Sequence, residues 1–446
     1  ITQYFKFISN NMCCGIKGIN MKASNYNIIF KMDREKSVLF NALTKRYLLV
    51  SNRFLDNYQQ IINNPMKYCK VAKLQIFLNK FKKCGLIIDK DIDELGLLQD
   101  SFNNQVNQAS YSLLIMTTYA CNFNCWYCVQ HHDNITLNEN VEEKIKKHIV
   151  KYLLENNIVD FNLSWFGGEP LLNFKSIDSI STYAKSFCLN HGIEFSCGIT
   201  TNGSLLTERM IERMIDLDFT DYQITLDGCK ENHNKTKFNN TIRNSFGLIL
   251  NNIKILVEKN WKAQVTLRIN YTEKNITPDL PDEIDKVLHS VRGKVAIMFR
   301  QVWQIRDNYD LINKVTPLII RLRNMGYGVV DDFGNFASLS CYVEKKHYLS
   351  VFPNGVIDNC NNKPIGKARG YLNDEGDIVW QKVPTERENT IFSLKSDCQT
   401  CKYLPICMGP CPALREGVLT SIKCMIKNPD EYFRKEIEQF VTFNLR

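Results

Sequence analysis

Residues 111–128 read Tyr-Ser-Leu-Leu-Ile-Met-Thr-Thr-Tyr-Ala-Cys-Asn-Phe-Asn-Cys-Trp-Tyr-Cys and contain the most informative pattern in the chain. A mostly apolar, strand-like run at 112–117 leads into a loop that holds Cys121, Cys125 and Cys128. Three thiols in C-x3-C-x2-C spacing suit an iron–sulfur cluster or a zinc ion. A [4Fe-4S] cluster usually takes four cysteines, so this loop would leave one iron open to a small ligand that chelates through an amine and a carboxylate.

Strands and helices alternate along the chain from this point. Apolar strand candidates cover 112–117, 161–166, 193–200, 222–226, 264–270 and 295–299. Amphipathic helices are expected at 141–153, 177–189, 208–217, 245–258 and 283–291, and one more at 310–325. Six such β/α units predict a parallel sheet covered by helices. Because such folds build active sites in the loops at the carboxyl ends of their strands, the cysteine loop lies where a catalytic site is expected.

The stretch from Cys121 to Cys128, with the aromatic Tyr127 before the last cysteine, resembles the signature of the radical S-adenosylmethionine (SAM) superfamily. The resemblance implies an α/β fold with a partial (β/α)6 TIM-like barrel over 110–330. It also implies that the three cysteines bind a [4Fe-4S] cluster, that the open iron binds the methionine part of SAM, and that Tyr127 lies beside the adenine. A structural zinc ion completed by His131 or His132 is the alternative.

Two glycines and a carboxylate follow the second strand, in Gly167-Gly168-Glu169-Pro170, which resembles the GGEP motif of the same family. Glycines allow a close approach of the backbone to a ligand. The resemblance implies that Glu169 pairs with the ammonium group of SAM. A carboxylate at a helix N-terminus, favoured by the helix dipole, is the structural alternative for Glu169.

Three later segments resemble further parts of the family's SAM site. Thr201-Asn202-Gly203 resembles its TNG segment, and Thr225-Leu-Asp-Gly, followed by His233, resembles its S-x-D-G…H segment with threonine in place of serine. Arg268 on the fifth strand could meet the SAM carboxylate through a charge-assisted pair, or occupy the barrel rim. We expect a structural role for His233. The SAM contacts implied by the resemblance are Tyr127, Gly167, Gly168, Glu169, Thr201, Asn202, Thr225 and Arg268.

A second group of cysteines lies near the C-terminus. Its order, with C-x2-C-x5-C-x3-C from residue 398, resembles the SPASM pattern of radical SAM peptide and protein maturases. The resemblance implies a cysteine-rich SPASM domain over 336–430 with two auxiliary [4Fe-4S] clusters. The implied ligands are Cys341, Cys360 and Cys411 for auxiliary cluster I, and Cys398, Cys401, Cys407 and Cys424 for auxiliary cluster II.

This C-terminal region has little apolar periodicity, so metal binding is expected to supply much of its folding free energy. No cysteine lies between Cys341 and Cys360, which leaves the fourth ligand of auxiliary cluster I to a substrate thiolate or a residue other than cysteine. Zinc ribbons are the alternative. Seven cysteines match no motif and are expected to be buried as small apolar side chains: Cys13, Cys14, Cys69, Cys84, Cys188, Cys197 and Cys229.

The segment 21–105 precedes the barrel and predicts a small α/β domain. Strands are expected at 25–30 and 37–51, and helices at 53–63 and 72–83, the second of them ending at Gly85. This order resembles the winged-helix peptide-recognition domain of many peptide maturases. The resemblance implies that the leader of a precursor peptide adds as a strand to the edge of its sheet.

The predicted function is therefore that of a radical SAM oxidoreductase. It would cleave SAM reductively to a 5′-deoxyadenosyl radical and oxidatively modify a ribosomally made peptide, through a thioether or carbon–carbon cross-link. Its cofactors would be SAM and three [4Fe-4S] clusters, and its partners a precursor peptide or protein and a reductant such as flavodoxin or ferredoxin. The alternatives are an anaerobic sulfatase maturase that forms formylglycine and a non-catalytic iron–sulfur electron carrier or scaffold.

Composition excludes several other classes. The 446 residues carry a net charge of +9 that is spread along the chain, with no basic, aromatic-interleaved stripe to indicate nucleic-acid binding. No apolar stretch of membrane-spanning length and no secretory signal is visible. An odd count of 17 cysteines fits complete disulfide pairing poorly and favours metal or redox chemistry in the cytoplasm.

Overall fold

The computed structural model describes residues 20–130, 132–305, 310–330, 339–362, 367–393, 396–415 and 424–444. Cys13, Cys14 and His131 lie outside the described residues. The chain divides into two compact units. The barrel unit comprises 109–332 and 347–384, and the flanking unit comprises 1–108, 333–346 and 385–446. In the described ranges, no helix is both long and apolar enough to span a bilayer.

The barrel unit is built on an eleven-stranded sheet whose first seven strands run parallel in the order β12-β11-β10-β9-β8-β7-β6. Their bounds are β6 (Ser110–Met116), β7 (Asp160–Phe166), β8 (Glu194–Thr201), β9 (Phe219–Leu226), β10 (Gln264–Tyr271), β11 (Val295–Gln301) and β12 (Gly328–Val330). The six strands expected from the apolar runs are all present. The short β12 adds a seventh parallel strand after the helix expected at 310–325.

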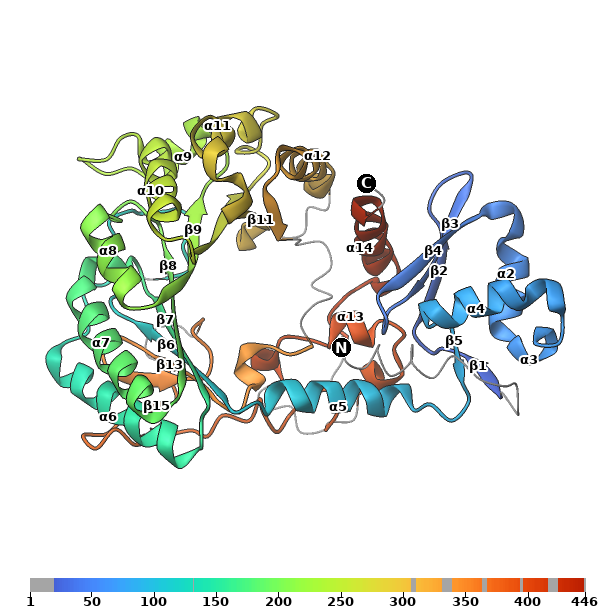
Figure 1. Cartoon of the computed structure of the whole chain (residues 1–446), viewed down its shortest axis with the longest axis horizontal. Helices are drawn as coiled ribbons and strands as arrows, with labels where there is room; N and C mark the ends of the chain where they lie inside the picture. Colours follow the sequence, from blue (N-terminus) through green and yellow to red (C-terminus); the bar gives the residue numbers. More distant parts are fainter. Residues whose placement is uncertain are drawn as a thin grey trace. The chain divides into compact units, whose positions relative to one another are not determined.

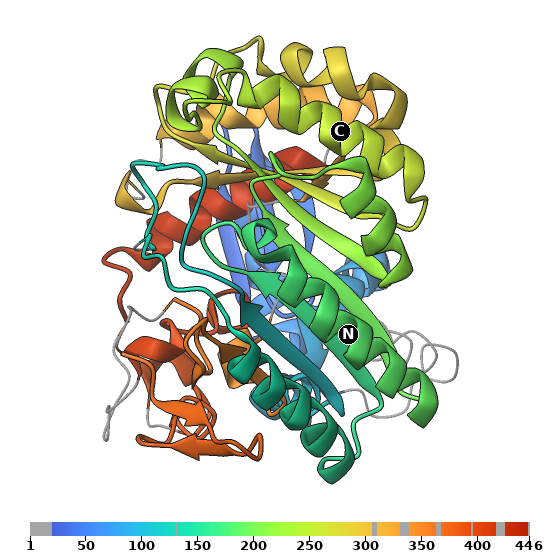
Figure 2. The same ribbon diagram turned by 90° about the vertical axis from the view of Figure 1, so that its left-hand side faces the viewer.

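Helices connect these strands and cover one face of the sheet, as both ribbon views show (Figures 1 and 2). They are α6 (Glu139–Glu155), α7 (Phe174–His191), α8 (Glu208–Asp216), α9 (Lys230–Thr236), α10 (Ser245–Lys259), α11 (Leu280–Leu288) and α12 (Asp310–Met325), with the short η3 (Pro170–Asn173) after β7. On β7 the buried Phe161, Leu163 and Trp165 alternate with the half-buried Asn162 and Ser164. The opposite face of the sheet is therefore more polar and more open.

The tail beyond residue 336 is more regular than its sequence predicts. Strand β13 (Tyr348–Val351) pairs in parallel with β6, and β14 (Val356–Asp358), β15 (Gly370–Leu372) and β16 (Ile378–Trp380) continue the same sheet. Residues 347–384 consequently belong to the barrel unit, whereas the sequence placed them with the other C-terminal residues. The reason is the hydrogen bonding of β13 to β6, a pairing between segments more than 200 residues apart that no local pattern reveals.

The flanking unit contains an antiparallel sheet of β2 (Asn27–Lys31), β3 (Lys36–Asn41) and β4 (Arg46–Ser51), and a pair formed by β1 (Met21–Ala23) and β5 (Ile87–Asp89). The single strand expected at 37–51 is wrong, because residues 42–45 form a turn in which Lys45 adopts a φ of 57°. Helices α2 (Leu55–Asn63), α3 (Pro65–Tyr68), α4 (Gln75–Cys84) and α5 (Glu94–Val106) complete this part. Gly85 ends α4 in the left-handed conformation, as predicted.

The two faces of this sheet pack against different partners. One face contacts α2 and α4 through a core around Leu39, Ile62 and Phe81. The other contacts the C-terminal part of the chain through a core that includes Phe40, Leu404 and residues of α14 (Pro429–Asn444). Cys398, Cys401 and Cys407 are packed against this second core. They lie in the short η7 (Asp397–Thr400) and α13 (Leu404–Cys407) and between them. The N-terminal sheet and these cysteines therefore share one compact unit.

Candidate functional site

The cysteine triplet lies in the loop between β6 and α6, at the carboxyl end of the first strand of the barrel unit. The ends of this loop are held together where Thr118 and Thr136 form a β-bridge. Cys121 and Cys125 are half-buried, and Cys128 is exposed. Burial, with smaller contributions from the Glu169 carboxylate and the neighbouring thiols, raises the pKa of Cys121 to about 12. Without metal this thiol is protonated at neutral pH, so a metal or cluster that binds there would displace its proton.

The two glycines after β7 pack against the backbone that leads into Cys121. Gly168 N–H donates to Thr118 O over 2.9 Å, and Glu169 N–H donates to Ala120 O over 2.9 Å. A Cβ atom on Gly168 would overlap the carbonyl oxygens of Ala120 and Tyr119. These glycines therefore allow the backbone after β7 to lie close to the cysteine loop, and this contact helps to fix the position of the loop.

Glu169 is fully buried at the end of β7 and carries three hydrogen bonds. Its carboxylate accepts from the Thr201 hydroxyl over 2.7 Å, from Asn202 N–H over 2.8 Å and from Leu171 N–H over 3.1 Å. Burial raises the pKa of Glu169, and these hydrogen bonds oppose that shift. The structure thus brings together the expected residues from β7 and β8. Glu169 also caps η3, in agreement with its structural alternative.

Tyr127 is fixed by a buried polar network that the sequence did not predict. Its hydroxyl donates to Asp227 and accepts from Lys237 Nζ over 3.1 Å and from Asn270 Nδ2 over 3.1 Å. Lys237 Nζ also lies 2.7 Å from the second Asp227 oxygen, in an ion pair whose side chains are only 3% and 1% exposed. Burial opposes ionisation of Asp227, but the Lys237 ammonium holds the pKa of this carboxyl below its usual value. The cysteine loop is thereby anchored to β9, β10 and the end of α9.

His233 has a structural place beneath this network, as expected. The Asp227 N–H donates to His233 Nδ1 over 3.0 Å, and the ring is fully buried. Burial lowers the pKa of His233 to about 3. The imidazole is therefore neutral and supports the turn after β9, where Gly228 has a φ of 72°.

Thr225 and Arg268 lie opposite each other on β9 and β10, on the sheet face that the helices do not cover. Arg268 Nε donates to Asn270 Oδ1 over 3.0 Å, which links this arginine to the network around Tyr127. The two predicted residues are thus brought together near the carboxyl ends of their strands. Asn270, two residues after Arg268, was missed.

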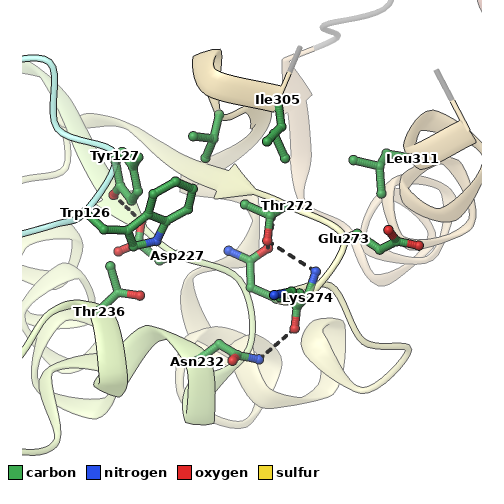
Figure 3. Close-up of a pocket in the computed structure, with 12 residues that line it drawn as sticks. Trp126, Tyr127, Asp227, Asn232, Thr236, Thr272, Glu273, Lys274, Ile305 and Leu311 are labelled. Atoms are coloured by element: carbon green, nitrogen blue, oxygen red, sulfur yellow. Dashed lines mark hydrogen bonds between the residues drawn. The ribbon is translucent and has the colours of Figure 1, made fainter. Parts of the chain in front are cut away.

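A pocket of about 550 Å³ lies next to Tyr127 (Figure 3). One side of the pocket is formed by Trp126 and Tyr127 of the cysteine loop, with Asp227 behind them. Its other lining residues include Thr272–Asn275, Val302, Ile305 and Leu311. Its volume lies in the range of small-molecule and cofactor sites. Trp126 is 61% exposed at this pocket. An apolar wall with a few polar groups suits a ligand that carries an aromatic base and a sugar.

The auxiliary cysteines divide between the two units. Cys360 belongs to the barrel unit, two residues after the end of β14, and the other six belong to the flanking unit. In the described ranges, no group of three or more Cys, His, Asp and Glu side chains is arranged to hold a single metal ion. The cysteines of a [4Fe-4S] cluster bind separate irons and need not converge on one point.

The described cysteines without a motif are mostly buried, as predicted. Cys84, Cys188, Cys197 and Cys229 are buried, and Cys69 is half-buried. Cys197 accepts a hydrogen bond from Trp165 Nε1 over 3.3 Å inside the barrel unit.

The sequence missed Lys237 and Asn270 because their roles depend on the fold. Lys237 lies in the polar run at 230–237, where charged residues ordinarily face solvent. One signal was available, since His233 and Lys237 are four residues apart and such residues share a helix face. Asp227, the partner of Lys237, was considered only as part of the Thr225-Leu-Asp-Gly motif, and no ion pair was predicted for it.

Comparison with known proteins identifies the barrel. Residues 115–275 match the family model described as the radical SAM superfamily, a range that begins in β6 and ends after β10. The chain contains a radical SAM domain in this range. The match contains the cysteine triplet, the GGEP segment and the Tyr127 network.

Similarity to known proteins extends beyond the matched domain. The radical SAM cyclopropyl synthase TigE of Paramaledivibacter caminithermalis is 22% identical over 92% of this chain and 90% of its own length. A solved structure of anSMEcpe with bound AdoMet has a TM-score of 0.54 and 17% identity, covering 75% of this chain and 97% of that one. A structure of SuiB from Streptococcus suis has a TM-score of 0.50 and 14% identity, covering 91% and 100%. Both structures confirm the α/β fold.

Proposed function

We propose that this protein is a peptide maturase that uses radical SAM chemistry to oxidise a ribosomally made precursor. The observation that carries the proposal is that the sheet β2-β3-β4 ends in a partly apolar strand, β4, which pairs with β3 alone among the described strands and belongs to the same chain as the radical SAM domain. Such an edge suits the binding of an extended peptide. The structural neighbour anSMEcpe has also been solved with bound AdoMet and the Cp18Cys peptide, which supports a peptide substrate.

The proposed SAM site combines the cluster loop with the network behind it. Cys121, Cys125 and Cys128 would hold the cluster, which when bound supplies an electron that cleaves SAM to methionine and a 5′-deoxyadenosyl radical. Glu169 would accept the SAM ammonium group in a buried position. Gly167, Gly168, Thr201, Asn202 and Thr225 would shape the site around it.

Tyr127 and Arg268 have distinct parts in this proposal. The adenosyl group would occupy the pocket beside Tyr127, whose ring is immobilised through its hydroxyl. Arg268 would meet the SAM carboxylate from the open face of the sheet. Trp126 at this pocket would limit the access of water to the radical.

The auxiliary clusters are proposed with the ligands implied by the cysteine pattern. Cys398, Cys401, Cys407 and Cys424 would bind cluster II, all within the flanking unit. Cys341, Cys360 and Cys411 would bind cluster I, with its fourth position open to a substrate thiolate or another ligand. These clusters would accept the electron that the substrate radical loses, which makes the net reaction oxidative. The oxygen sensitivity of such clusters fits a cytoplasmic enzyme of anaerobic metabolism.

The peptide would add to β4 and not to β2. Backbone hydrogen bonds join Asn52 N–H to Glu35 O and Met32 N–H to Lys36 O. Because hydrogen-bonded and non-bonded residue pairs alternate along antiparallel strands, the backbone groups of Tyr47, Leu49 and Ser51 point away from β3. The equivalent outward groups on β2 include Lys31 O, which already accepts from Arg434 over 2.8 Å. The edge of β2 is thus partly capped by α14. Among the described strands, none pairs with the outer edge of β4, where Tyr47 O accepts only a long contact of 4.0 Å from the weak donor Cys84 Sγ.

The reaction itself can be tested by mass. Anaerobically reconstituted enzyme with SAM, a reductant and the short peptide encoded nearest its gene should yield peptide lighter by two hydrogens. Cys125→Ala should abolish both this product and 5′-deoxyadenosine. Unchanged peptide with 5′-deoxyadenosine still formed would contradict the peptide proposal and favour sulfatases as substrates. Failure to cleave SAM at all would favour a non-catalytic iron–sulfur protein.

The docking edge can be tested by proline substitution. Leu49→Pro removes one outward N–H from β4, and proline is tolerated on edge strands where the N–H faces away from the sheet. It should weaken binding of the precursor peptide about tenfold, in line with the loss of main-chain hydrogen bonding. Ile29→Pro makes the same change on the outer edge of β2 and should leave the affinity unchanged. Equal affinities of the two variants would contradict docking at β4.

A further inference from the structure

A buried carboxylate holds the backbone of Cys341. Cys341 N–H donates to Glu344 Oε2 over 2.9 Å, within the short turn η6 (Tyr342–Glu344). The other Glu344 oxygen accepts from Arg415 over 2.7 Å, and these two side chains are 4% and 2% exposed. Arg415 also donates to Asn389 O over 3.3 Å. All of these residues belong to the flanking unit.

The same arrangement occurs behind Cys360 in the barrel unit. Cys360 N–H donates to Asp358 Oδ1 over 3.0 Å. Arg369 binds Asp358 through two nitrogens, over 2.7 Å and 3.0 Å, and the two side chains are 4% and 0% exposed. Arg369 also donates to the neighbouring Asn359. Two cysteines about 20 positions apart in sequence, in different units, thus have a buried carboxylate–arginine pair behind the backbone amide.

The other cysteines with a described backbone bond have neutral acceptors. Cys128 N–H donates to Cys125 O, Cys401 N–H to Cys398 O and Cys407 N–H to Tyr403 O. Cys398 N–H donates to the Ser396 hydroxyl over 3.0 Å. The ionic arrangement is therefore found at two of the three cysteines assigned to auxiliary cluster I. It is not found at those members of the other two sets whose amide bonds are described.

The negative charge of a carboxylate is unfavourable next to a cysteine that binds an iron–sulfur cluster. An iron–sulfur cluster with thiolate ligands is anionic, so a lone buried carboxylate close to it would be repelled and costly to ionise. The arginine removes this cost by balancing the charge and by orienting both carboxylate oxygens. One oxygen remains directed at the cysteine amide, which fixes the backbone from which the thiol projects.

We propose that Glu344–Arg415 and Asp358–Arg369 are positioning pairs that hold Cys341 and Cys360 ready to bind auxiliary cluster I. Neither pair touches the reacting atoms. Each acts within its own unit, through the amide of its own cysteine. This inference rests on the proposed assignment of both cysteines to auxiliary cluster I.

The test compares two kinds of substitution at each carboxylate. Glu344→Ala and Asp358→Ala remove the acceptor of the cysteine amide. Glu344→Gln and Asp358→Asn keep one oxygen acceptor for that amide, but they remove the charge and replace the other oxygen, which accepts from the arginine, by an NH2 group. Each full-length variant is purified anaerobically and reconstituted, and its iron and sulfide content and the electron paramagnetic resonance signals of its reduced clusters are recorded. Arg292→Met is the control, because it disturbs an ion pair with Asp285 that touches no cysteine.

The alanine variants should lose about one third of the iron and the signal of a single cluster. The amide variants should retain that iron and show a more positive reduction potential for the same cluster, because the arginine charge is then unbalanced. Loss of iron from all three clusters, or equal iron loss in the alanine and amide variants, would show that the pairs act only through the fold and would overturn the proposal. Unchanged iron in the alanine variants would overturn it as well.

The parental protein tests the cluster assignment separately. Iron for three clusters per chain supports the proposed auxiliary sites, whichever way the variants behave. Iron for one cluster alone, with the Cys121–Cys128 loop intact, would remove the assignment on which the positioning pairs depend and would overturn both proposals. In that case Cys341→Ala would leave the iron content unchanged.

Discussion

The cysteine loop of the barrel unit and the cysteines of the flanking unit are held in place in different ways. The loop from Cys121 to Cys128 is tied down by contacts from other elements: Gly168 beneath it, and Asp227 and Lys237 around Tyr127. Cys398, Cys401 and Cys407 instead pack directly against the apolar core of their unit. The loop proposed to hold the SAM cluster is thus attached to a sheet that has its own core. Three of the cysteines proposed for auxiliary cluster II lie instead against the core of their own unit.

Removal of metal should have the largest effect of the changes proposed here, and it should affect the flanking unit much more than the sheet of the barrel unit. Structural metal sites can contribute on the order of 10 kcal/mol to folding. Chelation of the clusters should therefore sharply raise amide hydrogen exchange in 396–415 and α14, and leave β6 to β11 protected. Mass-spectrometric exchange of the holo and metal-free proteins measures both regions in one sample. Equal deprotection of the two regions would remove the distinction between them.

Breaking the buried ion pair should be the largest single effect in the barrel unit. Lys237→Met leaves Asp227 buried without its cation, which costs about 3–5 kcal/mol for a pair of this kind. Denaturant unfolding of the metal-free protein, followed by exchange in β9 and β10, would report the loss. Arg213→Met is the control, since the Arg213–Asp178 pair is 37% exposed on both sides and should contribute less than about 1 kcal/mol. Similar losses in both variants would mean that burial does not govern these pairs.

Acid should weaken the barrel unit selectively. All seven histidines of the sequence lie in 109–332 or 347–384. His148 is buried between Tyr111 and Gly376 O, and burial lowers its pKa to about 4 from 6.5. Because the folded-state pKa is the lower one, the unfolded state binds the extra proton. The contribution of His148 to the free energy of unfolding is therefore fully present above pH 6.5. It falls by about 3 kcal/mol as the pH drops toward 4.

The pH dependence of unfolding checks this prediction. In the interval between pH 6.5 and 4, the unfolding free energy of the barrel unit should fall, and the fall should be smaller in His148→Gln. His191→Gln is the matched control, because His191 is exposed at the end of α7. A slope that His148→Gln leaves intact would show that other groups cause the acid sensitivity.

Crowding the contact beneath the cysteine loop should have the smallest of these effects. Gly168→Ala places a methyl group against the carbonyl oxygens of Ala120 and Tyr119, and such overpacking typically costs about 1–3 kcal/mol. It should also raise the KM for SAM, because the loop must shift. Gly293→Ala has no atom within 4 Å of the new Cβ and should change neither quantity. Wild-type KM in Gly168→Ala would contradict the anchoring role of this glycine.

The sequence predicted the part of the fold that local periodicity encodes. Strands β6 to β11 and their helices were found because alternation and helical spacing reflect burial on one face. The hairpin at 36–51 was missed, since its turn has no Gly, Pro, Asn or Asp and depends on Lys45 in the left-handed region. Helix α14 was also missed, although Phe433, Ile437 and Val441 recur every four residues and are buried.

Those residues of the candidate site that belong to a single sequence motif were predicted. Contacts between residues that are distant in the sequence were missed. The cysteines, Glu169 and Thr201 follow from sequence patterns. The contact of Tyr127 with Asp227, 100 residues away, depends on β9 lying at the right depth in the sheet. The pairing of β13 with β6 and the carboxylate–arginine pairs depend likewise on tertiary packing. Short-range patterns do not contain these contacts.

In the proposed reaction, a radical formed at the Cys121–Cys128 loop removes hydrogen from a bound peptide. The direct measurement is deuterium transfer, in which the enzyme turns over SAM with the candidate precursor peptide made fully deuterated at carbon. The account predicts 5′-deoxyadenosine that carries one deuterium, formed together with a lighter peptide, and loss of both in Cys125→Ala. Deuterium-free 5′-deoxyadenosine formed at the same rate with and without peptide would contradict it.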